Sequence, residues 1–393
     1  MVESPGDEAG RRWMRRALEL AERGRGRTRP NPMVGAVLVR DGEVVGEGFH
    51  ERAGAPHAEV RALGAAGDRA RGSTLYVTLE PCRHWGRTPP CTRALIRAGV
   101  RRVVAAMEDP DPRVAGQGLA ELRAAGVEVA VGLMGEEARR LNEAYLTHRR
   151  LGRPFVTMKY AMTLDGRIAT AARDSRWVSG EAARRRVHEL RAQVDLVAVG
   201  VETVLADDPL LTVRLAEEGP EGRPNPIRLV LDSRARTPLE SRLLGTAAEA
   251  PVWIATTRHA PAERLEALRA AGAEILLLPD RDGRVDLRAL FAELGRRGLL
   301  HVLLEGGATI HGAALAARVV DRLMVFVAPR IAGGSAALGP VGDPGVRRMA
   351  EALRLRPVAC EPVGEDWLIV AEPLGEPPGD GTAEGGEPVC SQD

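Results

Sequence analysis

Two short stretches decide the architecture of this chain: His57-Ala58-Glu59, and Pro81-Cys82 followed after eight further residues by Cys91. One histidine and two cysteines provide three metal ligands, whereas a structural zinc site normally uses four. A catalytic zinc site uses three protein ligands and keeps one position open for water. Glu59 is placed to exchange a proton with that water without binding the metal. The spacing therefore predicts a catalytic zinc site with His57, Cys82 and Cys91 as ligands.

The flanking residues predict that two of these ligands stand at helix starts. His57 follows Pro56, and Cys91 follows Pro89-Pro90. The free amides of a helix N-terminus favour a thiolate. A histidine, a glutamate two residues later and a Pro-Cys pair further on are also the signature of zinc-dependent nucleobase deaminases, although the second cysteine there follows more closely. The chemistry that this indicates is hydrolytic removal of an amino group from a nitrogen heterocycle. The alternative is an ordinary histidine with two buried apolar cysteines.

Strand-like and helix-like segments alternate along the chain and are interrupted by Leu151-Gly152-Arg153-Pro154. Such alternation is typical of α/β layers, and glycine with proline marks a domain joint. We therefore expect two α/β domains, residues 1–151 and 152–372. One helix is expected over about 136–149 in the first. Residues 373–393 are rich in Gly, Pro and Glu, which predicts a disordered tail.

Composition excludes several functional classes. The formal net charge is +1 and aromatic residues make up 3%, which argues against a nucleic-acid-binding protein. No apolar run is long enough to span a membrane, and the start lacks a signal-peptide core. The four cysteines form no dense disulfide framework, so a reducing cytoplasm is expected. Lys159 is the only lysine, and an arginine cannot replace a compact ammonium at a tight site.

The first part of the chain resembles the deaminase half of the bifunctional riboflavin biosynthesis deaminase/reductase family. The resemblance rests on residues 28–35 (TRPNPMVG), 57–60 (HAEV) and 78–91 (TLEPCRHWGRTPPC), where the long spacer between the cysteines is also found. It implies a cytidine-deaminase-like three-layer α/β/α domain that acts on a diaminopyrimidinone carrying a ribosylamino 5-phosphate. It also implies substrate contacts by Asn31, His50, His84 and Arg87. For each of these residues the alternative is a role in loop structure.

The second part resembles the reductase half of the same family. The matching segments are residues 159–169 (KYAMTLDGRIA), 175–180 (SRWVSG), 200–214 (GVETVLADDPLLTVR) and 303–310 (LLEGGATI). The last segment places Gly306-Gly307 between a strand and a helix, where backbone amides can approach a phosphate or simply form a tight turn. It is not a G-x-G-x-x-G fingerprint. The resemblance spans about residues 10–372 and implies a dihydrofolate-reductase-like α/β domain that uses NADPH.

The reductase resemblance also implies site residues. Those expected to line the cofactor are Ala161, Trp177, Thr203, Asp207, Ser233, Gly307, Ala308, Thr309, Ile310, His311, Gly312 and Ala313. Those expected to line the substrate are Lys159, Asp165, Ser175, Arg191, Leu211, Arg214 and Glu305. Lys159 and Asp165 would assist proton movement or hold the ribose, and Asp165-Gly166 would otherwise be a turn. Arginines suit a phosphate dianion, and their alternative role is surface ion pairing.

These expectations define one function and two alternatives. The expected enzyme deaminates the pyrimidine with one zinc ion per chain, then reduces the ribosyl group to ribityl with NADPH. Ser233 and Arg234 at a strand end are expected to meet the 2′-phosphate of NADPH. The alternatives are a tRNA or nucleoside deaminase fused to an unrelated domain, and an inactive protein that binds a flavin precursor. Family members associate through the reductase domain, so a homodimer or higher homo-oligomer is expected, with no nucleic-acid or membrane partner.

Overall fold

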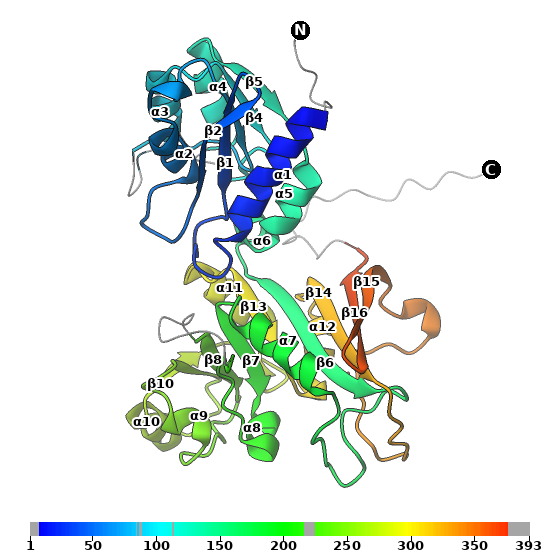
Figure 1. Cartoon of the computed structure of the whole chain (residues 1–393). Coiled ribbons are helices and arrows are strands. Elements are labelled where there is room, and N and C mark those ends of the chain that lie inside the picture. Colours follow the sequence, from blue (N-terminus) through cyan, green and yellow to red (C-terminus); the bar gives the residue numbers. More distant parts are fainter. Residues whose placement is uncertain (1–7, 84, 86–88, 112–113, 216–224, 376–393) are drawn as a thin grey trace, which may run out of the picture. The chain divides into compact units, whose positions relative to one another are not determined.

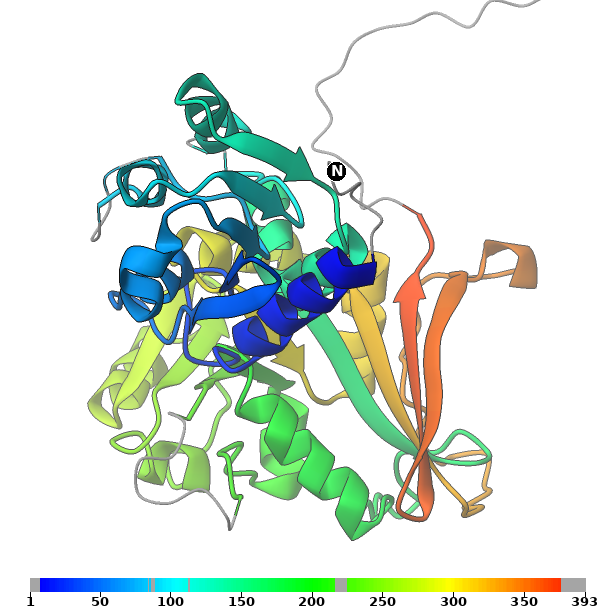
Figure 2. The same ribbon diagram turned by 45° about the horizontal axis from the view of Figure 1, so that its top comes forward.

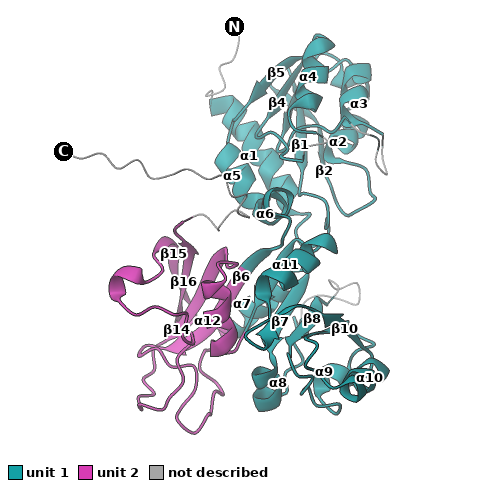
Figure 3. Cartoon of the chain, turned by 180° about the vertical axis from the view of Figure 1, so that it is seen from behind, with its two compact units in different colours: residues 1–156, 184–305 teal, residues 157–183, 306–393 magenta. Residues whose placement is uncertain are grey.

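The computed structural model describes residues 8–83, 85, 89–111, 114–215 and 225–375 (Figure 1). The chain divides into two compact units: unit 1 contains residues 1–156 and 184–305, and unit 2 contains residues 157–183 and 306–393 (Figure 3). The expected joint at residues 151–154 lies inside unit 1, so the boundary between two domains stays a prediction. Among the described residues, no helix has both the length and the apolar character needed to cross a membrane.

The first part of unit 1 is built on a five-stranded sheet in the order β2-β1-β3-β4-β5. Strands β1 and β2 and strands β1 and β3 are antiparallel, and the remaining pairs are parallel. The strands are Gly35–Arg40 (β1), Glu43–Phe49 (β2), Thr74–Val77 (β3), Arg102–Ala105 (β4) and Glu128–Val131 (β5). The helices are Glu8–Glu22 (α1), Ala58–Ala66 (α2), Cys91–Ala98 (α3), Gln117–Ala124 (α4), Gly135–Leu141 (α5) and Glu143–Leu151 (α6), with a short 3-10 turn at Gly67–Ala70.

Glycines on β1 and β2 allow helices to lie close against both faces of this sheet. A Cβ on Gly35 would lie 1.9 Å from the Ala17 carbonyl oxygen of α1, which is packed along the sheet in Figure 2. A Cβ on Gly48 would lie 2.5 Å from the Ala58 carbonyl oxygen of α2. Because neighbouring residues of a strand point to opposite faces, α1 and α2 cover opposite sides. The expected three-layer α/β/α arrangement is therefore confirmed.

The second part of unit 1 is a parallel sheet in the order β10-β9-β8-β7-β13. Its strands are Leu196–Gly200 (β7), Ile227–Leu231 (β8), Val252–Thr256 (β9), Ala273–Leu277 (β10) and His301–Leu304 (β13). Its helices are Glu181–Arg191 (α7, which begins in unit 2), Val201–Asp207 (α8), Arg242–Gly245 (α9), Ala262–Ala270 (α10) and Leu287–Arg296 (α11), and a small hairpin joins Asp280–Arg281 (β11) to Arg284–Val285 (β12). Parallel strands end at one edge of a sheet, so the segments after β7, β8 and β13 meet there.

Unit 2 continues from Thr157 within β6 (Phe155–Thr163), which is parallel to β14 (Arg322–Ala328). Strand β14 is antiparallel to β16 (Asp366–Pro373), which is in turn antiparallel to β15 (Leu355–Val363). The unit also contains α12 (Ala308–Ala316) and a 3-10 turn at Met349–Glu351. The expected α/β class is thus confirmed in both units.

Several elements differ from the sequence-based expectation, and two of them have a clear physical reason. The helix expected over 136–149 is divided at Asn142, whose side-chain oxygen accepts from the Met33 backbone N–H at 2.8 Å and whose amide donates to the Met33 carbonyl at 2.8 Å. Strand β15 was not expected, because most of its side chains are exposed and it contains Pro357 and Pro362. Proline is compatible with such an edge strand, since an edge leaves part of the backbone unpaired. The predicted tail beyond residue 375 lies outside the described residues.

The loop that carries Cys82 is fixed by the buried carboxylate of Glu80. One oxygen accepts from the backbone N–H groups of Asp109 (3.1 Å) and Gly116 (2.8 Å). The other accepts from Gly118 (2.9 Å) and Leu119 (3.2 Å). Four donors to one carboxylate satisfy a buried charge that would otherwise be costly. Glu80 therefore ties the end of β3 to the segment that leads into α4, two residues before Cys82.

We predict that Glu80→Gln destabilises this part of the protein by about 2–4 kcal/mol, because its NH2 group would face two buried backbone donors that lose their acceptor. Urea unfolding measures the stability. The rate at which a chelating dye removes zinc measures the integrity of the Cys82 loop, and we expect this rate to increase. Glu128→Gln, at an exposed position on β5, is the matched control and leaves both quantities unchanged. Wild-type stability and zinc retention in Glu80→Gln would contradict this role.

Candidate active sites

Three residues from separate elements bring their metal-binding atoms together in unit 1. His57 immediately precedes α2, Cys82 lies in the loop after β3, and Cys91 is the first residue of α3. Nδ1 of His57 lies 3.5 Å from Sγ of Cys82 and 3.3 Å from Sγ of Cys91. All three ligand atoms lie within 4.8 Å of one another. Tetrahedral zinc with ordinary bond lengths separates N and S ligands by about 3.6 Å, so these residues fit one zinc ion.

The two thiols are electronically different. Hydrogen bonds with Cys91 and with His57 lower the pKa of Cys82. The hydrogen bond with Cys82 and burial both raise the pKa of Cys91. The lowered pKa favours the thiolate at Cys82, the form that binds a metal.

Glu59 stands next to these ligands, in the first turn of α2, and is only 3% exposed. Burial raises the pKa of Glu59 to about 7, although the neighbouring His57 opposes the shift. It is outside the group of ligand atoms that lie close enough to hold a metal. A buried carboxyl group beside the ligands, able to exchange a proton near neutral pH, is suited to general acid–base work.

Two of the four predicted substrate contacts of this half adjoin the metal ligands. The side-chain amide of Asn31 lies 3.0 Å from Nε2 of His50. Nδ1 of His50 lies 3.3 Å from the Pro56 carbonyl oxygen, and its ring meets the His57 ring edge-on at 5.4 Å between centroids. The Pro56 carbonyl needs an N–H, so Nδ1 is protonated and Nε2 accepts from Asn31. The other two predicted contacts, His84 and Arg87, lie outside the described residues.

The glycine pair before α12 provides part of the predicted cofactor site, in unit 2. Gly306 has φ 146° and Gly307 φ 96°, values that side chains rarely adopt. Gly307 directly precedes α12, so the predicted residues from Ala308 to Ala313 form its first two turns. The Gly342 N–H donates to the Ala308 carbonyl at 2.7 Å, which holds a neighbouring segment against this helix. The arrangement is the strand–turn–helix geometry expected of a phosphate-binding turn.

The other predicted residues of unit 2 lie on β6 and in the loop that follows it. Ala161 and Lys159 are on β6, with Nζ of Lys159 5.8 Å from the centre of the Phe326 ring. Ser175 is half-buried, and Trp177 is 61% exposed with its carbonyl accepting from Arg330 at 3.1 Å.

Asp165 forms three hydrogen bonds that hold a loop. Its carboxylate accepts from the Thr163 hydroxyl at 2.6 Å and from the backbone N–H groups of Ala332 (3.1 Å) and Gly333 (2.7 Å). These three donors lower the pKa of Asp165 to about 2, and the hydrogen bond from Thr163 has the largest effect. A carboxylate so fully used as an acceptor fits the turn-forming role better than proton transfer.

The remaining predicted cofactor residues are in unit 1. Thr203 and Asp207 lie on α8, directly after β7, and Ser233 follows β8. The Ser233 hydroxyl accepts from the Val285 N–H at 3.0 Å, and its carbonyl accepts from the Thr257 hydroxyl at 3.0 Å. Arg234 beside it is exposed. These positions share the edge at which the parallel strands end, as expected for ligand-binding residues of such a sheet.

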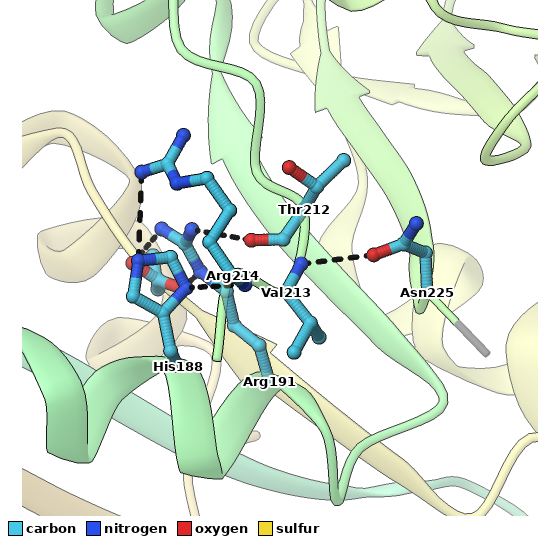
Figure 4. Close-up of polar contacts among 7 residues, drawn as sticks. His188, Arg191, Thr212, Val213, Arg214 and Asn225 are labelled. Carbon is cyan, nitrogen blue, oxygen red and sulfur yellow. Dashed lines mark hydrogen bonds and ion pairs between the residues drawn. The ribbon is translucent and has the colours of Figure 1, made fainter. Parts of the chain in front are cut away.

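The predicted substrate residues of unit 1 gather around the end of α7 (Figure 4). Arg191 donates to both Glu305 oxygens at 2.5 and 2.9 Å and to the Thr212 carbonyl at 3.2 Å. Leu211 is buried, whereas Arg214 is exposed and contacts His188. Arg191 and Glu305 thus form an ion pair that fixes the segment bearing Arg214.

Sequence reasoning missed three residues of these sites: Glu80, Asn142 and His188. Glu80 stands in a quoted motif, and a charged residue at the end of an apolar strand was a signal for a buried carboxylate. His188 precedes Arg191 by one helical turn, a spacing that places both on one face of a helix. Asn142 gave no signal, since its Met33 partner is distant in sequence.

Comparison with known proteins gives two family matches. The family described as the cytidine and deoxycytidylate deaminase zinc-binding region matches residues 7–107, and the RibD C-terminal domain matches residues 154–369. The riboflavin biosynthesis protein RibD of Escherichia coli is 46% identical, with 91% of this chain and 97% of the relative covered. RibD of Aquifex aeolicus is 43% identical, over 92% and 98%.

Solved structures of similar proteins point to the same family. Acinetobacter baumannii RibD superposes with a TM-score of 0.85 at 38% identity, with 94% of this chain and 99% of that chain covered. A Thermotoga maritima protein described as a diaminohydroxyphosphoribosylaminopyrimidine deaminase/5-amino-6-(5-phosphoribosylamino)uracil reductase superposes with a TM-score of 0.81 at 36% identity, over 93% and 99%. Both halves of the chain are matched by the same relatives, and the chain therefore belongs to the family of the riboflavin biosynthesis protein RibD.

Proposed function

We propose that this chain is a bifunctional enzyme of riboflavin biosynthesis. It deaminates 2,5-diamino-6-ribosylamino-4(3H)-pyrimidinone 5′-phosphate and then reduces the ribosyl group with NADPH, which gives 5-amino-6-(5-phosphoribitylamino)uracil. The observation that carries this proposal is the convergence of His57, Cys82 and Cys91 beside the buried Glu59, in a chain matched over both halves by RibD proteins. We place the reactions in the cytoplasm, where the ligand thiols stay reduced.

In the deaminase half, His57, Cys82 and Cys91 would hold a zinc ion, which when bound would make a water molecule nucleophilic at neutral pH. Glu59 takes a proton from the attacking water and delivers it to the departing amino group, so that ammonia leaves and a carbonyl forms. Asn31 and His50 lie beside the ligand His57 and orient the pyrimidine. His84 and Arg87 are proposed to contact the substrate from the loop between the two cysteines.

In the reductase half, NADPH supplies the hydride to C1′ of the ribosyl group. The protein binds and orients both molecules. We propose that Ala161, Trp177, Thr203, Asp207, Ser233 and the turn from Gly307 to Ala313 hold the cofactor. We propose that Lys159, on β6, either holds the ribose or supplies the proton that the C4′ oxygen takes when the sugar ring opens. Asp165 shapes the loop after β6 through its three hydrogen bonds.

The substrate phosphate is assigned to the arginine-containing site at the end of α7. Arg214 faces this site, and Arg191 and Glu305 hold the segment that carries it. Leu211 lies in the same segment, and Ser175 of unit 2 is proposed to contact the substrate as well. A guanidinium group donates two parallel hydrogen bonds to a phosphate, which makes arginine the suitable residue.

The two activities are expected to respond differently to metal removal. The purified protein, given the diaminopyrimidinone phosphate and NADPH, releases ammonia and oxidises NADPH. After dialysis against a zinc chelator it should lose ammonia release, yet still oxidise NADPH when given the deaminated intermediate, because the zinc ligands lie in the deaminase half. Ammonia electrode readings and NADPH absorbance measure the two steps. Ammonia release that survives complete zinc removal would overturn the metal assignment.

Glu59→Gln tests the proton transfer separately from metal binding. The variant should keep one zinc ion per chain by elemental analysis, because Glu59 is not a ligand. Deamination should fall by at least about 100-fold, the size expected for loss of a general acid–base group. Reduction of the deaminated intermediate is the internal control and stays unchanged. Deamination at the wild-type rate would refute the role of Glu59.

We also propose that the protein is a homodimer through its reductase half. Strands β15 and β16 expose an apolar sheet face, formed by Cys360, Pro362, Trp367 and Ile369. Trp367 is 44% exposed. Contiguous exposed apolar side chains on an edge sheet mark an association surface, and a second copy of the same face is complementary in its apolar character.

Trp367→Glu should convert the dimer to a monomer, because it places a charge in the centre of the proposed apolar interface. Sedimentation velocity at micromolar concentration measures the mass. Leu277→Glu is the matched control: Leu277 is 62% exposed on the edge strand β10 of unit 1, and its replacement leaves the dimer intact. A monomeric wild-type protein, or a dimeric Trp367→Glu variant, would contradict the assignment.

A further inference from the structure

His188 occupies a position that the proposed function does not use. It lies on α7, one turn before Arg191, and is half-buried. The backbone N–H of Arg214 points at Nδ1 of His188 at 3.3 Å, and Nη2 of the Arg214 guanidinium lies 3.4 Å from Nε2 (Figure 4). One imidazole therefore meets two donors of the same arginine.

A neutral imidazole offers one acceptor nitrogen and one N–H. In the tautomer in which Nδ1 accepts from the Arg214 backbone, the proton is on Nε2. Nε2–H then lies beside the Arg214 guanidinium, which is itself only a donor. Two donors cannot bond to each other, but an oxygen atom about 2.8–3.0 Å from both can accept from both. The pair is thus arranged for an acceptor that is negatively charged.

The surrounding charges support an anion. Burial, together with the charges of Arg191 and Arg214, lowers the pKa of His188 to about 4, against the opposing effects of Glu305 and of the Thr212 backbone. Burial and the charges of Arg191 and Arg242 lower the pKa of Arg214. Both Glu305 oxygens accept from Arg191. Among the residues that the structure describes, no carboxylate is ion-paired with Arg214, so positive potential remains at its guanidinium group.

The segment that carries Arg214 is held on both sides. The Thr212 carbonyl accepts from Arg191 at 3.2 Å, and the Val213 N–H donates to the Asn225 side-chain oxygen at 2.9 Å. His188 then fixes the Arg214 backbone itself. A binding group whose main chain is fixed loses less conformational entropy when its ligand binds.

We propose that His188 is a phosphate-binding and specificity-determining residue of the reductase half, whose Nε2–H and the Arg214 guanidinium together bind one oxygen of the substrate's 5′-phosphate. This inference rests on the proposed function, since it assigns a new residue to the phosphate subsite of that reaction.

The test is steady-state reduction of the deaminated intermediate at saturating NADPH, followed by NADPH absorbance. His188→Ala should raise KM about tenfold with kcat unchanged, the loss expected for one hydrogen bond to a charged group. His188→Gln should recover most of the affinity, because its amide oxygen accepts from the Arg214 backbone and its NH2 donates to the phosphate. The same intermediate without its phosphate should show equal KM values with wild type and His188→Ala.

Arg186→Ala is the matched control. It removes a positive charge from the same helix at an exposed position paired with Glu189, and KM should change less than twofold. Deaminase activity and NADPH affinity of His188→Ala report whether the variant is folded. An unchanged KM would overturn the proposal. An equal rise in KM for the substrates with and without phosphate would overturn it too, because it would make His188 a purely structural residue.

Calorimetric titration with ribose 5-phosphate separates this inference from the proposed function. If the wild-type protein oxidises no NADPH, the proposed function fails. Weaker binding of ribose 5-phosphate to His188→Ala than to wild type would then still support the phosphate subsite. Equal binding to both would overturn it, whatever reaction the protein catalyses.

Discussion

Glu80 brings a negative charge into the interior, and four backbone N–H groups around it remove the cost of that burial. The same hydrogen bonds fix the direction in which the chain leaves β3. Cys82 follows two residues later, and its carbonyl accepts from the Thr92 N–H beside Cys91 at 3.2 Å. The convergence of the zinc ligands therefore depends on a carboxylate that is not itself one of the three ligands.

A carboxylate also fixes a neighbouring segment in the reductase half. The carboxylate of Glu305 stands at the end of β13 and is neutralised by Arg191. The Nη1 group of Arg191 stays available for the Thr212 carbonyl, and the ion pair leaves Arg214 without a competing acid among the described residues. A carboxylate in each half thus positions a ligand-binding segment, and in both cases each carboxylate oxygen accepts hydrogen bonds within the protein. Breaking either set would leave an uncompensated buried group.

Close packing on the sheet completes the deaminase site. Gly35 and Gly48 bring α1 and α2 within contact of the strands, and His57 and Glu59 are at the start of α2. A larger residue at Gly48 would push α2 away from β2, and the metal ligand His57 would move with it. Helix position and ligand position are therefore set by the same small residues.

The residues of the zinc site and the fold class could be predicted from the sequence alone. Covalent spacing along the chain predicted the order and types of the zinc ligands, the glutamate beside them and the alternation of strands and helices, because each depends on local chemistry and periodicity. The tertiary structure decided what distant segments do to one another. Asn142 interrupts a helix and hydrogen-bonds to the backbone of Met33. Strand β15 pairs with β16 although its sequence has no apolar alternation. His188 contacts Arg214, which lies 26 residues further along the chain. Such partners are selected by packing in three dimensions, so their identities leave no mark in the local sequence. The zinc ligands could be predicted because their spacing is local, whereas the distant backbone groups that hold Glu80, and through it the Cys82 loop, could not.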